Sequence, residues 1–190
     1  MRILAISGSL RRDSHNTALL RAAAELLPPG VELEVYDRLK EIPPFDDDDR
    51  LAGRPAPVGD LWQAIEAADA VLISTPEYNH SVPGQLKNAL DWMSRPLAES
   101  PLRNKPAAVV GASTGMFGAV WAQAEMRKVL TAIGARVIDE ELPVPMADEL
   151  LAGGRLSDQQ IEAQLAAIVE QLADAVAERE RVLATRERAA

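Results

Sequence analysis

The chain alternates between short apolar runs and longer segments in which apolar residues repeat at helical spacing. Strands buried on both faces of a parallel sheet are predicted at 2–6, 70–74 and 107–110, where the runs are nearly continuous. A half-exposed strand is predicted at 31–36 and a short one at 136–138. Helices are predicted at 18–27, 61–68, 85–92, 119–133 and 161–176.

Strand-then-helix alternation repeated five times predicts an α/β fold with a doubly wound five-stranded parallel sheet in three α/β/α layers. The flavodoxin-like strand order fits best, although periodicity does not determine the order. We see no internal repeat and no composition shift, so residues 1–190 are predicted to form a single domain. The charge-rich tail after about 177 is expected to fray.

The proline-rich and aspartate-rich segment 39–57 is predicted to be a long loop, a type that is often functional or mobile. Its acidic run, 46–49, raises the question of a calcium site. Consecutive carboxylates lack the spaced ligands and the glycine of an EF-hand loop, so a solvated acidic stretch is the favoured interpretation.

Composition narrows the functional classes. The 190 residues include no cysteine, which excludes thiolate metal sites, a cysteine nucleophile and disulfides. Two histidines argue against a histidine-based metal site. A net charge of −9 argues against nucleic acid as a partner. No apolar run reaches the roughly 18–20 residues of a membrane span, and the N-terminus lacks a signal-peptide layout, so we expect a cytoplasmic protein.

Ligands of open parallel sheets bind beyond the carboxyl ends of the strands. The first such strand exit, 7–17, combines hydroxyls, an asparagine, Arg11 and Arg12 with a helix N-terminus, a combination suited to a phosphate. It lacks G-x-G-x-x-G and G-x-x-x-x-G-K-[ST], which favours a monophosphate over a dinucleotide or triphosphate. The alternative is that Ser14 or Asn16 merely caps the helix.

Two further strand exits carry candidate groups. In 75–88, Tyr78 offers an aromatic face, and Asn79 with nearby backbone amides can hydrogen-bond a heterocycle. Glu77 invites a general-base interpretation, but no nucleophile is evident beside it, and His80 is expected to face solvent. In 111–118, small residues let a flat ring approach the backbone. Together the three exits predict a pocket with a phosphate end and a flat-ring end.

The most specific motif is the run from Pro76 to Trp92, P-E-Y-N-H-S-V-P-G-Q-L-K-N-A-L-D-W. With the sequence 8–11, G-S-L-R, it makes the chain resemble the NAD(P)H-dependent FMN reductase family, a flavodoxin-like group of quinone, chromate and azo-dye reductases. The resemblance extends from Met1 to about the last helix.

This resemblance implies FMN as cofactor and NADPH or NADH as co-substrate. The cofactor-binding residues that it implies are Ser9, Leu10, Arg11, Ser14, His15, Asn16, Thr17, Pro76, Glu77, Tyr78, Asn79, His80, Ser113 and Gly115. No catalytic side chain is named, because the hydride chemistry belongs to the flavin. We expect a ping-pong cycle that ends on a quinone-like, azo, metal-oxyanion or free-flavin acceptor. Asp13 departs from the family pattern and is expected to face solvent or pair with Arg12.

Two alternatives remain open: a flavodoxin-type electron carrier, and a binding or regulatory module that has lost the flavin. The resemblance also implies a homodimer or homotetramer with the flavin near the subunit interface. Five large apolar residues near the proposed site are candidates either for that interface or for the core: Trp92, Met93, Met116, Phe117 and Trp121.

Overall fold

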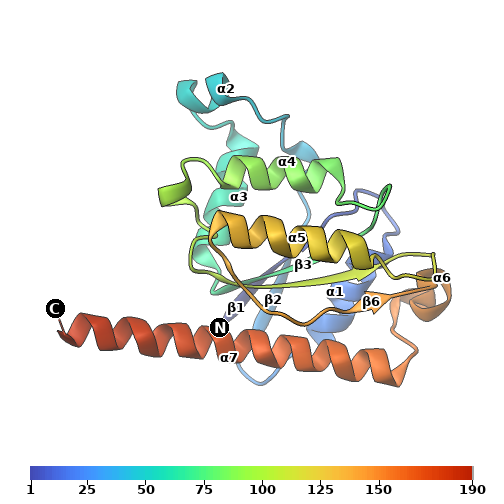
Figure 1. Ribbon diagram of the computed structural model, residues 1–190. Helices are drawn as coiled ribbons and strands as arrows, with labels where there is room; N and C mark the ends of the chain where they lie inside the picture. The colour runs from blue at the N-terminus through green and yellow to red at the C-terminus, as the bar shows by residue number, and fades with distance from the viewer. Residues whose placement is uncertain (190) are drawn as a thin grey trace.

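The computed structural model describes residues 1–189, in which a parallel sheet lies between two layers of helices (Figure 1). The strand order is β2-β1-β3-β4-β5, and a sixth strand, β6, also pairs with β4. This is the flavodoxin-like order that the sequence favoured, although the strand-helix alternation alone did not determine it. The strands are β1 (Arg2–Ser7), β2 (Glu32–Tyr36), β3 (Ala70–Thr75), β4 (Pro106–Ala112), β5 (Arg136–Val137) and β6 (Pro143–Val144).

The fifth position of the sheet is divided between two short strands. β5 pairs with Pro106 and Ala107 at the start of β4, and β6 pairs with Gly111 and Ala112 at its end. The sequence pattern predicted the first of these and missed the second. A two-residue strand that begins with a proline has too little apolar periodicity to be recognised.

Side chains alternate between the two faces of the sheet and build two cores. Leu4 and Ile6 of β1 face α3 (Ala56–Ala67), α4 (Gly84–Met93) and α5 (Val120–Ile133). Ile3 and Ala5 face α1 (His15–Glu25) and α7 (Gln159–Ala189). Because both faces are covered, the central strands are buried throughout, as their continuous apolar runs predicted.

The C-terminal tail corrects one prediction. α7 continues as helix to Ala189 instead of fraying after about 177, and its end projects past the sheet (Figure 1). The extra turns are rich in Ala, Glu and Arg, which are strong helix formers, and contain no glycine or proline. None of the helices described is long and apolar enough to cross a membrane.

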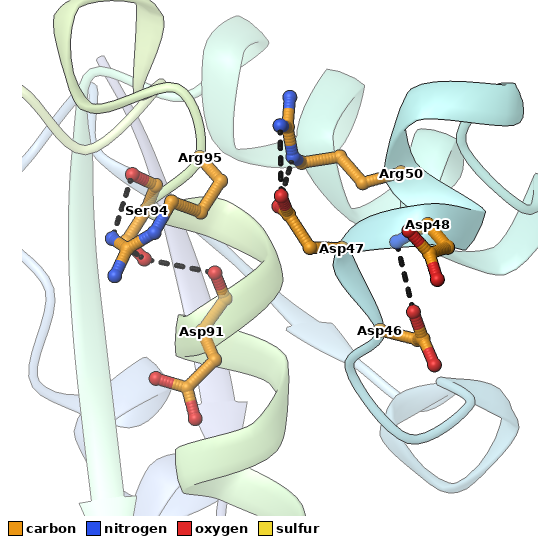
Figure 2. Close-up of polar contacts among 7 residues, drawn as sticks. All are labelled: Asp46, Asp47, Asp48, Arg50, Asp91, Ser94 and Arg95. Carbon is orange, nitrogen blue, oxygen red and sulfur yellow. Dashed lines mark hydrogen bonds and ion pairs between the residues drawn. The ribbon is translucent and has the colours of Figure 1, made fainter.

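Segment 39–57 is also more ordered than a loop. It contains a 3₁₀ turn, η1 (Leu39–Glu41), and a short helix, α2 (Asp47–Ala52). Figure 2 shows the Asp46 carboxylate accepting from the Asp48 N–H at 2.8 Å and Asp47 paired with Arg50 at 2.7 Å. The acidic run therefore caps and begins a helix, where negative charge is favourable. Across the described residues, no cluster of His, Asp and Glu is suited to a metal ion.

Side chains of α4 fasten the first part of this segment. Asn88 Nδ2 and Trp92 Nε1 both donate to the Pro43 carbonyl, at 2.8 and 2.9 Å, and Asn88 Oδ1 accepts from the Phe45 N–H at 2.7 Å. Gln85 donates to two further carbonyls of the segment at 2.8 Å each. Three residues of the Pro76-to-Trp92 motif, Gln85, Asn88 and Trp92, therefore attach segment 39–45 to α4.

Two short elements complete the chain between β6 and α7. They are α6 (Ala147–Leu150) and the 3₁₀ turn η3 (Ala152–Gly154). One more 3₁₀ turn, η2 (Leu97–Glu99), lies earlier in the chain, directly after α4. α6 lies at the carboxyl edge of the sheet, beside the end of β6 (Figure 1). It therefore borders the edge at which the predicted ligand loops meet.

Candidate functional site

Three loops meet at the carboxyl edge of the sheet. Loop 1 (8–14) follows β1, loop 2 (76–83) follows β3, and loop 3 (113–119) follows β4. Together they enclose a hollow of about 210 Å³, which we call the three-loop hollow. Its lining residues are Ser9, Arg11, Ser14, His15, Asn16, Pro76, Glu77, Tyr78, Ala112, Ser113 and Thr114. The three predicted strand exits therefore form one hollow.

Loop 1 gives the hollow a cationic end. Arg11 is exposed, and its guanidinium donates to the carbonyl of Asp13 at 2.5 Å, which bends the loop around it. Ser14 is the N-cap of α1, and its hydroxyl accepts from the Thr17 N–H at 3.3 Å. Capping and ligand binding are compatible here, because a hydroxyl that accepts one hydrogen bond can still donate another. Asp13 is exposed and does not line the hollow.

Asn16 lies beneath the hollow as a structural link. Its side chain is buried, its Nδ2 donates to the Ala112 carbonyl at 2.9 Å, and its Oδ1 accepts from the Ala112 N–H at 3.1 Å. The same Oδ1 accepts from the Ser74 hydroxyl at 2.8 Å. Asn16 thus joins α1 to the ends of β3 and β4, and it fixes the spacing of the loops above them.

The tip of loop 2 is a tight turn. Tyr78 and Ser81 exchange two backbone hydrogen bonds, at 3.0 and 3.2 Å. Asn79 and His80 have positive φ, at 53° and 58°, as both central residues of a type I′ turn do. Tyr78 is half-exposed at the rim of the hollow, whereas Asn79 and His80 lie at the tip and do not line it.

Glu77 caps a helix that is remote in sequence. Its Oε2 accepts from the backbone N–H groups of Trp121 and Ala122, at 3.0 and 3.1 Å, in the first turn of α5. The residue at the N-cap position, Ala119, has no side chain that could do so. The Glu77 side chain is only 12% exposed, and its Oε1 lies 3.6 Å from His80 Nδ1. These contacts favour a role in joining loop 2 to α5 over a role as a general base.

Replacing Glu77 with alanine is expected to lower the free energy of unfolding by about 1 kcal/mol, because two N–H groups of α5 lose their acceptor. Glu77→Gln keeps one acceptor oxygen and is expected to lose less. Urea unfolding measures both. Glu125→Ala removes an exposed carboxylate of the same helix and serves as the control, with a change within about 0.5 kcal/mol. Equal stability of the Glu77 variants and the control would rule out the cap.

Loop 3 is held by the chain that follows β6. The Ser113 N–H donates to the Val144 carbonyl at 3.1 Å, and the Ser113 carbonyl accepts from Ala147 at 3.0 Å. The Gly115 carbonyl accepts from Met146 at 3.2 Å. Ser113 lines the hollow but Gly115 does not. Ala112 and Thr114 line it too; both lie in the predicted exit 111–118, but neither was among the cofactor-binding residues that the resemblance implied.

Leu10 and Thr17 face away from the three-loop hollow. Both line a second hollow on the other side of loop 1. The Thr17 hydroxyl donates to Ser7 Oγ at 3.0 Å. The prediction that these two residues contact the cofactor stays a prediction, and the sequence could not resolve which side of loop 1 each one faces.

The five large apolar candidates divide between core and surface. Trp92 and Met93 are buried in the core. Met116, Phe117 and Trp121 are 80%, 61% and 41% exposed. The Trp121 ring lies 4.9 Å from Phe117 and 4.7 Å from His80, measured between centroids. An exposed apolar cluster therefore stands beside loops 2 and 3.

The strand order and the three-loop hollow define a flavodoxin-like protein with a site suited to a mononucleotide. A family model described as NADPH-dependent FMN reductase matches residues 1–149. An NAD(P)H-dependent FMN reductase of Pseudomonas aeruginosa is 43% identical over 160 residues, 83% of this chain and 85% of the relative. A quinone reductase of Escherichia coli K12 is 38% identical over 141 residues, 74% of each chain. The chain belongs to the NADPH-dependent FMN reductase family.

Solved structures agree with this assignment. FerB of Paracoccus denitrificans, a flavoenzyme NAD(P)H:(acceptor) oxidoreductase, has a TM-score of 0.81 and 34% identity, covering 94% of this chain and 98% of that one. The predicted fold and family are thus confirmed. So are the predictions that the protein is an oxidoreductase, that its cofactor is FMN and that NAD(P)H is its electron donor.

Proposed function

We propose that this chain transfers electrons from NAD(P)H to a small quinone-like acceptor, with FMN held in the three-loop hollow. The observation that carries the proposal is the hollow itself, cationic at loop 1 and open between loops 2 and 3. Family membership supports it, as does the 38% identity to a quinone reductase.

The residues present fit an FMN group. Arg11, Ser9 and the N-terminus of α1 would hold the phosphate, because a fixed positive charge and free backbone N–H groups favour an anion. Tyr78 and Ser113 would flank the ring from opposite loops. The one carboxylate in the lining, Glu77, is occupied by the N–H groups of α5. FMN, when bound, supplies the hydride-accepting chemistry.

Donor and acceptor would use the same open side of the hollow in turn, which is a ping-pong cycle. The exposed Met116 and Phe117 beside this opening provide apolar contact without a closed pocket, which suits acceptors of several shapes. Azo compounds, metal oxyanions and free flavin are the other acceptor classes within this proposal. It also includes a homodimer or homotetramer that covers the exposed apolar cluster, and a cytoplasmic location where both nicotinamides are available.

FMN titration of the purified protein, followed by NADH and NADPH oxidation with a quinone, tests the proposal. We expect saturable FMN binding, turnover without a protein partner, and parallel double-reciprocal lines. Arg11→Gln is expected to weaken FMN binding about tenfold. Lys128→Gln, which removes an exposed charge of α5, is the control and should leave FMN affinity unchanged.

The alternatives predict different results. A module without flavin would not bind FMN at all. An electron carrier of the flavodoxin type would bind FMN but would oxidise NAD(P)H only when a reductase protein was added.

A further inference from the structure

A second hollow lies on the opposite side of loop 1 from the three-loop hollow. It measures about 460 Å³ and is lined by residues of β1, loop 1, α1, β2 and η1. No residue of loop 2 or loop 3 is among its lining, but Ser9 and Arg11 line both hollows. The two spaces are therefore neighbours separated by loop 1. We call this space the basic hollow.

Four cationic side chains surround the basic hollow in a chain whose net charge is −9. They are Arg11 and Arg12 of loop 1, Arg21 of α1 and Lys40 of η1. Asp37, just after β2, is the one carboxylate of the lining. Among the described side chains, none of the four cations pairs with a carboxylate within 4 Å. This concentration of unpaired positive charge favours an anion.

The neighbouring Arg38 behaves differently. Its guanidinium pairs with Glu41 at 2.8 Å and with Asp60 at 2.5 Å, and it does not line the basic hollow. The fold therefore neutralises the cation beside Asp37, whereas the four cations that line the hollow have no carboxylate partner among the described side chains.

Tyr36 adds a buried hydroxyl without a partner. Its OH is shielded from solvent and has no hydrogen-bond partner within the described part of the chain, and the residue lines the basic hollow. Burial raises the pKa of the Tyr36 phenol; Arg38 opposes this rise, and Asp60, Glu41 and Asp37 add to it. A buried polar atom left unpaired needs an explanation. The Tyr36 ring packs against the core on the α3 side of the sheet, so the inference of an anion rests on the four cations and not on this hydroxyl, and Tyr36→Phe tests whether the hydroxyl takes part.

We propose that the basic hollow binds a phosphate dianion, and that this phosphate is the ribose 2′-phosphate of NADPH. The second part rests on the proposed function, because the donor has to extend from here to the adjacent three-loop hollow. Apolar surface for the attached base is present: Leu10 is 45% exposed, and Val35 and Leu39 also line the space. Arg12, Arg21 and Lys40 line this space and are not shared with the FMN phosphate, as Arg11 is; these three cations against one carboxylate would make NADPH the preferred donor. Free inorganic phosphate is the other possible source of the same chemistry.

Calorimetry on the FMN-loaded protein in a phosphate-free buffer tests the site directly. Adenosine 2′,5′-bisphosphate is expected to bind at least about tenfold more tightly than adenosine 5′-monophosphate, because only the former carries the 2′-phosphate. Arg21→Gln and Lys40→Gln should each reduce this affinity about tenfold. Asp37→Asn should increase it, since the change removes the opposing charge. Lys128→Gln is the charge-matched control and should leave it unchanged.

Tyr36→Phe separates ligand binding from folding. It removes only the unpaired hydroxyl, so the melting temperature should stay the same or rise while the affinity for the bisphosphate falls. A lower melting temperature with unchanged affinity would show that the hydroxyl has a structural partner, and would remove Tyr36 from the site.

The ratio of kcat/KM for NADPH to that for NADH distinguishes the two sources of phosphate. It should fall about tenfold in Arg21→Gln. If the variants weaken binding of inorganic phosphate but leave this ratio unchanged, the hollow takes free phosphate and the NADPH assignment is wrong. Equal affinity for the two adenosine phosphates also overturns the NADPH assignment, and failure of the bisphosphate and of inorganic phosphate to bind overturns the site. Either failure would leave FMN binding and quinone reduction intact, whereas loss of those would count against the proposed function instead.

Discussion

Asn16→Ala is expected to lower the free energy of unfolding by about 3 kcal/mol, a large part of the stability of a domain of this size. The substitution removes three hydrogen bonds at a side chain that is 3% exposed. The Ser74 hydroxyl and both backbone groups of Ala112 would lose these partners. Each such group costs about 1–3 kcal/mol, partly offset by local relaxation.

The same substitution should weaken FMN binding about tenfold or more, since loop 1 would no longer be held at a fixed spacing from loops 2 and 3. Urea unfolding and FMN titration measure the two effects. Gln164→Ala removes an exposed amide of α7 and is the control, with a change within about 0.5 kcal/mol. If Asn16→Ala weakened FMN binding without loss of stability, Asn16 would be a ligand contact and not the link described above.

Gly118→Ala is expected to have a comparable effect, about 3 kcal/mol of destabilisation. Gly118 has φ +57°, where a Cβ is unfavourable. An added Cβ would also lie 2.6 Å from the backbone of both Pro143 and Val144. Backbone cannot rotate away as a flexible side chain can, so loop 3 and β6 would have to separate.

Thermal and urea unfolding measure this loss, with FMN titration to detect movement of loop 3. Gly59→Ala is the matched control: it lies within α3, and no atom is within 4 Å of its added Cβ. That variant should gain about 0.5 kcal/mol, because alanine is the better helix former. A Gly118→Ala protein as stable as the wild type would mean that the contact between loop 3 and β6 is loose.

The frame of the fold could be predicted from hydrophobic patterning because buried parallel strands leave a strong signal. The run 70–74 became β3 with one residue added, and the run 107–110 became the centre of β4, which extends from Pro106 to Ala112. The elements that were missed lack such a signal. β6 has two residues, and α2 buries none, so neither shows a periodic apolar face. The end of α7 projects past the sheet, and its sequence is rich in strong helix formers.

The candidate site could be located from the sequence, but individual roles could not. Asn16 and Glu77 were predicted to contact the cofactor, yet each forms hydrogen bonds that join separate elements. A polar residue in a motif has the same appearance whether it binds a ligand or holds the loops in place. The basic hollow lay beyond prediction, because Tyr36, Lys40 and Arg21 come together only when β2 pairs with β1 and α1 packs on the sheet.

The interruption between β5 and β6 provides a position at this edge of the sheet where the chain can accept insertions. Residues 139–141 leave the sheet and are exposed before the chain returns to β4. An insertion at this excursion would reshape the wall beside loop 3 while the other strands kept their pairing. Proteins with this fold could in this way acquire different acceptor preferences while loop 1, the proposed site of the FMN phosphate, stays unchanged.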